Sequence, residues 1–235
     1  MSTDPILITG VGQRVGLHLA RTFLGRGRPV IGTYRTRRES IDKLAALGAT
    51  LHRCDFYDTA QVQTLIDAVT GGHERLRAII HNASDWLPDN ADLSAEEVMR
   101  RMMAVHVVAP YRINLALAPL LRSAAPSDIV HIGDYVSGRG SRKHIAYAAS
   151  KAAQDNLTLS FAALLSPEVK VNSIAPALVL FNEDDDAEYR QKTLRKSLMR
   201  REGGLDEMQH QIDYLLDSRY VTGRIVHMDG GRHLA

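Results

Sequence analysis

Residues 5–16 read PILITGVGQRVG, a short apolar run that turns through three glycines into a helical pattern. The run at 5–9 has the length and composition of a buried strand, and a helix is expected from about Val15 to Gly27. Glycines at such a turn let backbone N–H groups approach a pyrophosphate at the helix N-terminus. A tight structural turn is the alternative interpretation, because a glycine-rich turn alone is a weak motif.

The alternation of strand and helix continues along the chain. Further strands are expected at residues 29–34, 50–54, 76–80, 128–132, 169–174 and 224–228, and further helices at 38–47, 59–69, 95–103, 105–122 and 145–165. Short apolar strands separated by helices predict a parallel sheet covered on both faces. We therefore predict one doubly wound, Rossmann-type α/β domain over residues 1–235, with a seven-stranded parallel sheet flanked by helices.

The segment 181–201, between the last two predicted strands, is strongly charged. It is acidic at 183–186 and basic at Lys196, Arg200 and Arg201, an order that complements a helix dipole. Two interpretations stay open. The segment is either a plain charged surface helix or a lid over the carboxyl edge of the sheet, where ligands bind in open α/β folds.

Composition excludes several classes of protein. With 45% hydrophobic and 24% charged residues, the chain is neither disordered nor collagen-like. The formal charge is only +2 and the arginines are dispersed, so no nucleic-acid partner is expected. The single cysteine, Cys54, excludes an intrachain disulfide and a cysteine-clustered zinc site, and no spacing of His, Asp or Glu suggests a metal.

The setting expected from the sequence is the cytoplasm. Residues 1–5 lack the basic and apolar regions of a signal peptide. No uninterrupted apolar stretch approaches the roughly 18 residues that a membrane span needs, so no membrane partner is expected.

The residues that follow the first four predicted strands are those expected to bind a cofactor, and they favour NADPH. Arg35, Thr36 and Arg37 stand where an NAD-preferring site usually has Asp or Glu, and arginines fit a 2′-phosphate. They also fit the solvated start of a helix. Asp55 either accepts from the adenine amino group or caps the next segment. The other residues expected at the cofactor are Gly10, Gln13, Arg14 and Val15 at the pyrophosphate turn, and Asn82 and Ala83 after the fourth strand.

Tyr147 and Lys151 are the candidate catalytic pair. Their spacing of four residues puts both side chains on one face of the long helix at 145–165. A nearby cation stabilises tyrosinate, lowers the pKa of the phenol and also reaches the ribose hydroxyls of a cofactor.

Together these features resemble the short-chain dehydrogenases/reductases. The resemblance is carried by the TGxxxxxG turn at 9–16, Asn82-Ala83, Tyr147 with Lys151, and the segment NSIAP at 172–176. It extends from Ile6 to the sequence DGG at 229–231. It implies a Rossmann-type fold, a place for Pro176 beside the cofactor, and assembly into a homotetramer.

Within that family the chain resembles the pteridine reductases, and most closely the bacterial branch that acts on dihydromonapterin. Arg14 replaces a turn glycine, Ser84 replaces the glycine of the usual NNAG, and Asp134 stands where the general family has serine. The resemblance places Arg14 and Ser84 at the polar edge of a pterin. Trp86 is expected to stack on the ring. The alternatives are a core or interface aromatic for Trp86, a turn residue for Ser84 and a strand-end turn for Asp134.

Asp134 is the residue expected to select the substrate. A carboxylate donates no hydrogen bond to a ketone unless it is protonated, and beside Tyr147 it raises the pKa of the phenol against the pull of Lys151. A tyrosine that keeps its proton is suited to protonating an imine nitrogen. His106 falls near the position of a helical Asn that supports a relay water in many family members. It is either a substitute for that Asn or a buried packing residue, and His81 replaces the first Asn of NNAG.

The expected activity is NADPH-dependent reduction of 7,8-dihydromonapterin, or a related dihydropterin or dihydrofolate, with hydride transfer to C6 and protonation of N5. Asp134, Tyr147 and Lys151 are the expected catalytic residues. The expected substrate-binding residues are Arg14, Ser84, Trp86, Asp134 and Tyr147. The rival hypotheses are a carbonyl or ketone reductase of the same family and a non-catalytic NADP(H)-binding sensor.

Overall fold

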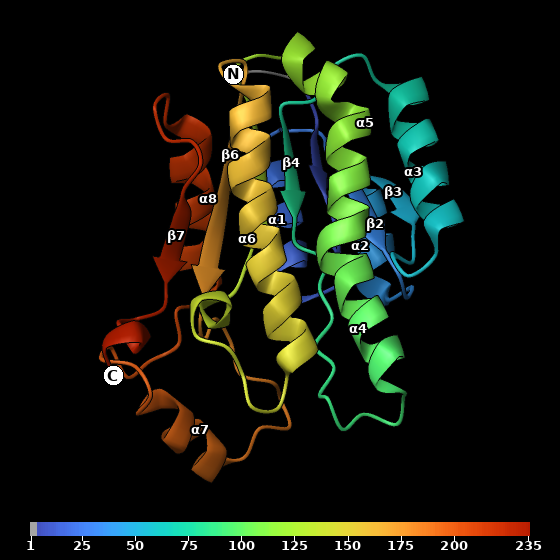
Figure 1. The fold of residues 1–235 in the computed structure, drawn as a ribbon. Coiled ribbons are helices and arrows are strands. Elements are labelled where there is room, and N and C mark those ends of the chain that lie inside the picture. Colours follow the sequence, from blue (N-terminus) through green and yellow to red (C-terminus); the bar gives the residue numbers. More distant parts are fainter. Residues whose placement is uncertain (1–3) are drawn as a thin grey trace.

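A parallel sheet of seven strands forms the centre of the protein (Figure 1), with the strand order β3-β2-β1-β4-β5-β6-β7. The computed structural model describes residues 4–235, so residues 1–3, part of the segment in which no signal peptide was expected, lie outside the described residues. The strands are β1 (Ile6–Ile8), β2 (Val30–Tyr34), β3 (Thr50–Arg53), β4 (Ala78–His81), β5 (Ser127–Ile132), β6 (Val169–Pro176) and β7 (Ile225–Met228). The predicted α/β fold with seven parallel strands is confirmed.

Helices cover both faces of the sheet (Figure 1). They are α1 (Arg14–Gly25), α2 (Glu39–Ala46), α3 (Thr59–Gly72), α4 (Ala95–Met103), α5 (Ala109–Ser123), α6 (Ile145–Leu165), α7 (Ala187–Leu194) and α8 (Leu205–Asp217), with a π-helical turn η1 (Ala104–Val108) and 3₁₀ turns η2 (Tyr135–Gly138) and η3 (Arg232–Leu234). Side chains alternate across each strand. In β1, Leu7 belongs to the core under α3, α5 and α6, whereas Ile6 and Ile8 belong to the core under α1, α2 and α8.

The C-terminal third of the chain differs in two places from the elements expected from the sequence. Helix α8 was not predicted, although Met208, Ile212 and Leu215 are buried at helical spacing. The charged segment is helical only over α7, where the Asp186 side chain caps the first turn by accepting from the Tyr189 N–H. Outside α7 the segment consists of turns and loops.

The sheet has its switch point between β1 and β4. From β1 the chain builds β2 and β3 on one side and β4 to β7 on the other, which is where open α/β folds bind ligands. The turn after β1 and the segment after β4 therefore meet at the carboxyl edge. In Figure 1, α7 lies beyond that edge, on the side to which the strand arrows of β6 and β7 point.

One continuous helical stretch, Ala95–Ser123, has the length and mean hydropathy (1.3) of a membrane-spanning helix, and half of its apolar window is buried inside the protein. The sequence expectation overlooked it because arginines interrupt the apolar run. The stretch comprises α4, η1 and α5, and α5 buries Ile113, Leu117 and Leu121 in the core. It therefore packs as a core helix.

Candidate active site

The turn after β1 brings backbone very close to backbone. Gly10 has φ +75°, and a Cβ there would lie 2.9 Å from the Ala83 Cα. A Cβ on Gly16 would lie 2.2 Å from the Gly10 carbonyl oxygen, so only glycine fits either position. The Asn82 side-chain amide donates to the Thr9 and Gly10 carbonyl oxygens, at 3.0 Å each, and fixes this turn to the end of β4.

The N-terminus of α1 opens from that turn and suits an anion. Gln13 precedes the helix without a side-chain capping hydrogen bond, and the first turn, which contains Val15, has no acidic residue. Free N–H groups and the helix dipole make such an end a phosphate site. The glycine turn and the uncapped helix together fit a pyrophosphate.

Arg14 connects this turn to the predicted lid segment. Its guanidinium donates to the Leu180 carbonyl oxygen at 2.9 Å and to Asn182 Oδ1 at 2.8 Å, with a longer contact of 3.4 Å to the Phe181 carbonyl oxygen. Arg14 also has φ +51°, a conformation that non-glycine residues rarely adopt. The sequence analysis expected this guanidinium on phosphate and pterin, and the structure places it on the residues after β6.

The two arginines expected at the 2′-phosphate are each paired with a carboxylate. Arg35 lies 3.0 Å from Asp85 Oδ2, which also accepts from the Tyr57 hydroxyl at 2.6 Å. Arg37 is paired with Asp42. Both arginine side chains remain more than half exposed, and Thr36 between them is exposed, so an anion can reach this corner but must compete with Asp85 for Arg35.

Asp55 follows β3 and shapes the turn into α3. Its Oδ1 accepts from the Tyr57 N–H at 3.0 Å, whereas the side chain that caps α3 is that of Asp58. The adenine contact stays a prediction. Pro176, the other residue expected at the cofactor from the C-terminal half, is the last residue of β6 and lies at the carboxyl edge.

Tyr147, Lys151 and Asp134 come together as the sequence spacing predicted. The Tyr147 hydroxyl donates to Asp134 Oδ2 at 2.8 Å, and Asp134 Oδ1 accepts from the Val136 N–H at 2.9 Å. The Lys151 ammonium donates to the Ile132 carbonyl oxygen at 2.8 Å and to Gln154 Oε1 at 3.2 Å. It lies 5.8 Å from the centre of the Tyr147 ring.

Burial and charge shift the pKa values of all three groups. Burial, reinforced by Asp134, raises the pKa of the Tyr147 phenol well above its ordinary value. Burial also raises the pKa of Asp134, and it lowers the pKa of Lys151 to about 8 against the attraction of Asp134 and Asp155. Tyr147 is therefore a protonated phenol at neutral pH, the state that the sequence analysis inferred from the carboxylate.

His106 links two serines beneath the site. It is fully buried in η1, where Nδ1 lies 2.8 Å from Ser150 Oγ and Nε2 lies 2.7 Å from Ser84 Oγ. The Ser150 hydroxyl already donates to the Tyr147 carbonyl oxygen, so His106 Nδ1 must be the donor to Ser150. Burial lowers the pKa of His106 well below its ordinary value, so the ring is neutral and its Nε2 accepts from Ser84. Ser84 also forms a hydrogen bond with the Tyr147 side chain, so this serine links His106 to the phenol.

Trp86 follows two residues after Ser84 and is exposed. The indole is 60% exposed, and His144 stacks on one face with ring centres 4.0 Å apart and an interplanar angle of 17°. The sequence analysis expected Trp86 as a stacking platform but did not identify His144 as its support. No local motif marks that pair, since the two residues are far apart in the sequence.

Sequence reasoning also missed a second carboxylate and a buried chain of polar residues. Asp155 accepts from Ser137 at 2.5 Å and from Ser173 at 3.3 Å, and its place four residues after Lys151 on α6 is a helical spacing that was readable in the sequence. The buried chain links His81, Asn114, His131 and Thr158. Within residues 4–235, no group of three or more His, Cys, Asp or Glu side chains is arranged to hold a metal ion.

Comparisons with known proteins give one consistent family. Residues 10–233 match the family model described as enoyl-(acyl carrier protein) reductase, a group of the short-chain dehydrogenases/reductases. A protein of Klebsiella pneumoniae named dihydromonapterin reductase is 55% identical over 232 residues, which cover 98% of this chain and 97% of that protein. An Escherichia coli protein of the same name is 54% identical with the same coverage.

Solved structures agree with these matches. A structure described as FolM alternative dihydrofolate reductase 1 from Brucella suis in complex with NADP has a TM-score of 0.89 and 25% identity, and covers 100% of this chain and 97% of its own. The Pseudomonas aeruginosa RhlG/NADP active-site complex has a TM-score of 0.87 and 25% identity, covering 99% of this chain and 97% of its own. Similarity to both complexes extends over nearly the whole fold, including the carboxyl edge where the site described above lies.

Proposed function

Because this chain belongs to the short-chain dehydrogenase/reductase family, we propose that it is an NADPH-dependent reductase of 7,8-dihydropterins. Its first candidate substrate is 7,8-dihydromonapterin, and a related dihydropterin or dihydrofolate is the next. The product is the tetrahydro form, made by hydride transfer to C6 and protonation of N5. The names of the relatives at 54–55% identity and the NADP complexes among the similar structures support this assignment.

The hydrogen bond of 2.8 Å from the Tyr147 hydroxyl to Asp134 carries the proposal. The acceptor is a carboxylate that occupies the position of a hydroxyl donor in ketone reductases of the family. A carboxylate repels the electron-rich oxygen of a ketone and accepts hydrogen bonds from N–H groups. Pterins offer N–H donors and a C=N bond, so the arrangement favours a pterin over a ketone.

The residues of the centre then have separable roles. Tyr147, protonated because burial and Asp134 raise the pKa of its phenol, holds the proton needed at N5. Asp134 orients that hydroxyl and is available to N–H groups of the substrate. Lys151 supplies positive charge beneath the phenol and reaches toward a ribose, while Trp86 and Ser84 hold the ring by stacking and by hydrogen bonding.

The residues at the switch point fit NADPH. The pyrophosphate would lie at the uncapped N-terminus of α1, the ribose next to Lys151 and the 2′-phosphate beside Arg35 and Arg37. When bound, NADPH supplies the hydride. Gly10 and Gly16 leave the space that backbone approach to a dinucleotide requires, since a Cβ at either position would collide with neighbouring backbone.

The assay is oxidation of NADPH by the purified protein with dihydromonapterin, dihydrofolate and a simple ketone as separate substrates. We expect turnover with the dihydropterin, little with the ketone, and a loss of at least about a hundredfold in kcat for Tyr147→Phe, the scale of general acid catalysis. Turnover of the ketone but of no dihydropterin would show a carbonyl reductase. Unchanged NADPH consumption by Tyr147→Phe would remove Tyr147 from the chemistry, and absence of any turnover would favour the sensor hypothesis.

Assembly as a homotetramer in the cytoplasm completes the proposal. Exposed apolar side chains on α5 and α6, among them Tyr111, Leu115, Leu159 and Leu164, give the surface on which copies of the chain would pack. Light scattering coupled to size-exclusion chromatography measures the mass of the assembly. A monomer at micromolar concentration would contradict the tetramer.

A further inference from the structure

A large basic pocket opens beside the proposed active site. It has a volume of about 830 Å³ and lies between the 135–142 loop, the end of α7 and the C-terminal turn η3. Five cationic side chains line it, together with Tyr135, Gly140, Ser141 and Ala235. The five are Arg139, Arg142, Arg195, Lys196 and Arg232. No Asp or Glu is among the lining residues that the structure describes.

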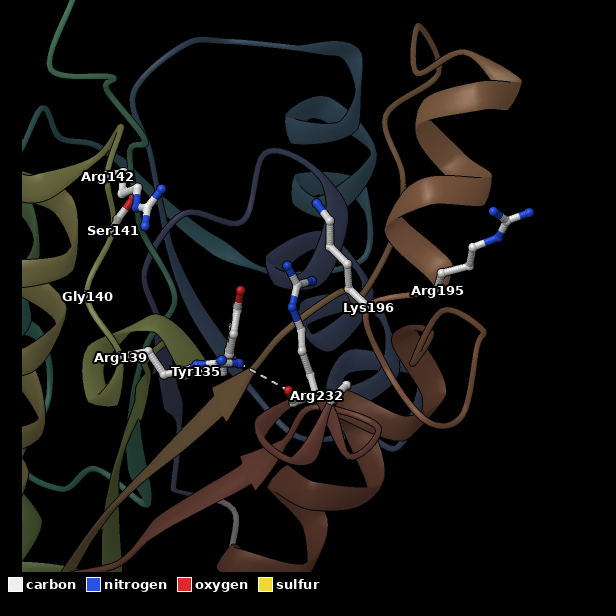
Figure 2. A pocket seen from close by; sticks show the side chains of 9 residues that line it. Tyr135, Arg139, Gly140, Ser141, Arg142, Arg195, Lys196 and Arg232 are labelled. Atoms are coloured by element: carbon white, nitrogen blue, oxygen red, sulfur yellow. Dashed lines mark hydrogen bonds between the residues drawn. The ribbon is translucent and has the colours of Figure 1, made fainter.

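The cationic side chains of this pocket differ in where they point. In Figure 2, Lys196 and Arg232 project side by side into the pocket, and Arg142 lies on the opposite wall, whereas Arg195 points away. Arg232 also lies over the Tyr135 ring, 4.5 Å from its centre. Among residues 4–235, no acidic side chain forms an ion pair with any of the five.

Seven arginines outside the pocket do have carboxylate partners. Those at positions 26, 35, 37, 75, 77, 100 and 101 each pair with a described carboxylate. Burial lowers the pKa of Lys196, and the positive charges of Arg232, Lys192 and Lys143 lower it further. Concentrated, unpaired charge of one sign is the arrangement that attracts a counter-ion of opposite sign.

Two residues of the pocket connect it to the catalytic centre, Tyr135 through the chain and Arg232 through its charge. Tyr135 directly follows Asp134, and the positive charge of Arg232 is close enough to act on the Asp134 carboxyl. A substrate whose ring lies against Asp134 and Trp86 would therefore extend its side chain toward these cations. Guanidinium groups bind phosphate and carboxylate oxygens through paired N–H donors, and Arg142 and Arg232 place such groups in this pocket.

We propose that the basic pocket binds the side chain of a dihydropterin substrate that carries two or more negative charges, as phosphate groups or as glutamyl carboxylates. The proposal rests on the proposed function, because it takes the pterin ring to lie at Asp134. It assigns the 135–142 loop, α7 and η3 the task of selecting substrates by the charge of their side chain. Neutral dihydropterins would bind through the ring alone.

The test compares substrates that differ only in charge. One pair is dihydromonapterin and the same compound with a triphosphate on its side chain, and the second is dihydrofolate with one and with three glutamates. The variants are Arg142→Gln with Lys196→Gln, and as matched control Arg219→Gln, an exposed arginine in the loop between α8 and β7. Arg232 is left intact because its charge also acts on Asp134.

We expect the double variant to lower the ratio of kcat/KM for charged over less charged substrate by about tenfold or more, the scale of a lost charge-assisted hydrogen bond. The control variant should leave the ratio unchanged. A change in the triphosphate pair alone identifies phosphate as the natural charge, and a change in the glutamate pair alone identifies carboxylate. Unchanged ratios in both pairs overturn the proposal.

A binding experiment keeps this result separate from the proposed function. Inorganic tripolyphosphate is titrated into wild type and variants by calorimetry, with NADP⁺ saturating so that the cofactor's phosphate sites are filled. Binding that weakens about tenfold in the double variant supports the pocket as an anion site even if no dihydropterin is turned over, an outcome that refutes the proposed function alone. Equal binding of tripolyphosphate to wild type, the double variant and the control variant overturns the proposal that the pocket binds anions.

Discussion

The ionisation of Lys151 gives the sharpest test of the proposed catalytic centre. Burial lowers the pKa of this ammonium from 10.5 to about 8. At about 1.4 kcal/mol for each pKa unit, this lowering corresponds to roughly 3 kcal/mol against the charged form. Half of the protein therefore loses the charge beneath Tyr147 near pH 8, where an ordinary lysine would keep it. We predict that kcat/KM for NADPH, which reports groups of the free enzyme, falls about tenfold for each pH unit above about 8.

Substitution of Asp134 should shift the alkaline limb of the pH profile, the fall in kcat/KM above about pH 8, in a known direction. The Asp134 carboxylate is 2.8 Å from the Tyr147 hydroxyl, and Lys151 is 5.8 Å from the centre of the same ring, so the two charges are roughly 10 Å apart or less. Unit charges about 10 Å apart interact with about 1.7 kcal/mol at an effective dielectric constant near 20. Asp134→Asn removes this attraction and should shift the limb about one pH unit to the acid side.

The assay measures initial rates of NADPH oxidation from about pH 6 to about pH 10 for wild type, Asp134→Asn and Lys151→Arg. The guanidinium of Lys151→Arg stays charged throughout, so its residual activity should show no limb near pH 8. NADPH binding measured by fluorescence across the same range gives a second readout that needs no turnover. A limb that persists in Lys151→Arg, or that moves to the alkaline side in Asp134→Asn, would refute the assignment to Lys151.

Three further predictions follow from other contacts. Burial lowers the pKa of His81 from 6.5 to about 4, so its contribution to the free energy of unfolding should fall by up to about 3 kcal/mol as pH drops from about 6.5 to about 4. In urea unfolding, His81→Asn should remove this contribution to the pH dependence. Equal slopes of unfolding free energy against pH in wild type and His81→Asn would contradict the prediction. Trp86, the only Trp, should be quenched by a dihydropterin in the presence of NADP⁺, and Trp86→Leu should raise KM about two- to tenfold; unquenched fluorescence would remove it from the site. Arg14→Gln loses the contacts to residues 180–182, so amide hydrogen exchange of these residues should accelerate about tenfold, while exchange in β4 stays constant. Unchanged exchange at 180–182 would show that Arg14 does not hold the segment.

The fold could be predicted where local pattern and burial agree. Helix α6 begins and ends where its apolar spacing predicts, and each strand was placed within two residues of its observed ends. Helix α8 was missed because charged and polar residues separate its buried positions, so its core face is narrow. The segment around α7 was overextended because a run of charges satisfies a helix dipole without providing an apolar face, and Thr193 is the only α7 residue that is buried.

The site could be predicted where one element sets the spacing. Tyr147 and Lys151 share α6, and Asp134 follows the neighbouring strand β5, so topology brings them together. The partners that were missed lie on segments distant in the sequence. Asp85 forms an ion pair with Arg35, and His144 stacks on one face of Trp86. Both partners lie in loops whose paths no local motif specifies.

Asp134 determines the protonation of the centre as a whole. Its negative charge adds to burial in raising the pKa of Tyr147, and it opposes burial in holding up the pKa of Lys151. Both effects keep protons on the centre. A serine at the same position would donate to a substrate oxygen and leave Lys151 to favour tyrosinate, which suits a carbonyl that becomes an alkoxide. An imine nitrogen is more basic than a carbonyl oxygen and needs only a weak, firmly protonated acid as hydride arrives at the adjacent carbon. The exchange of one hydroxyl for one carboxylate therefore changes the acid strength of the centre in the direction that a dihydropterin requires.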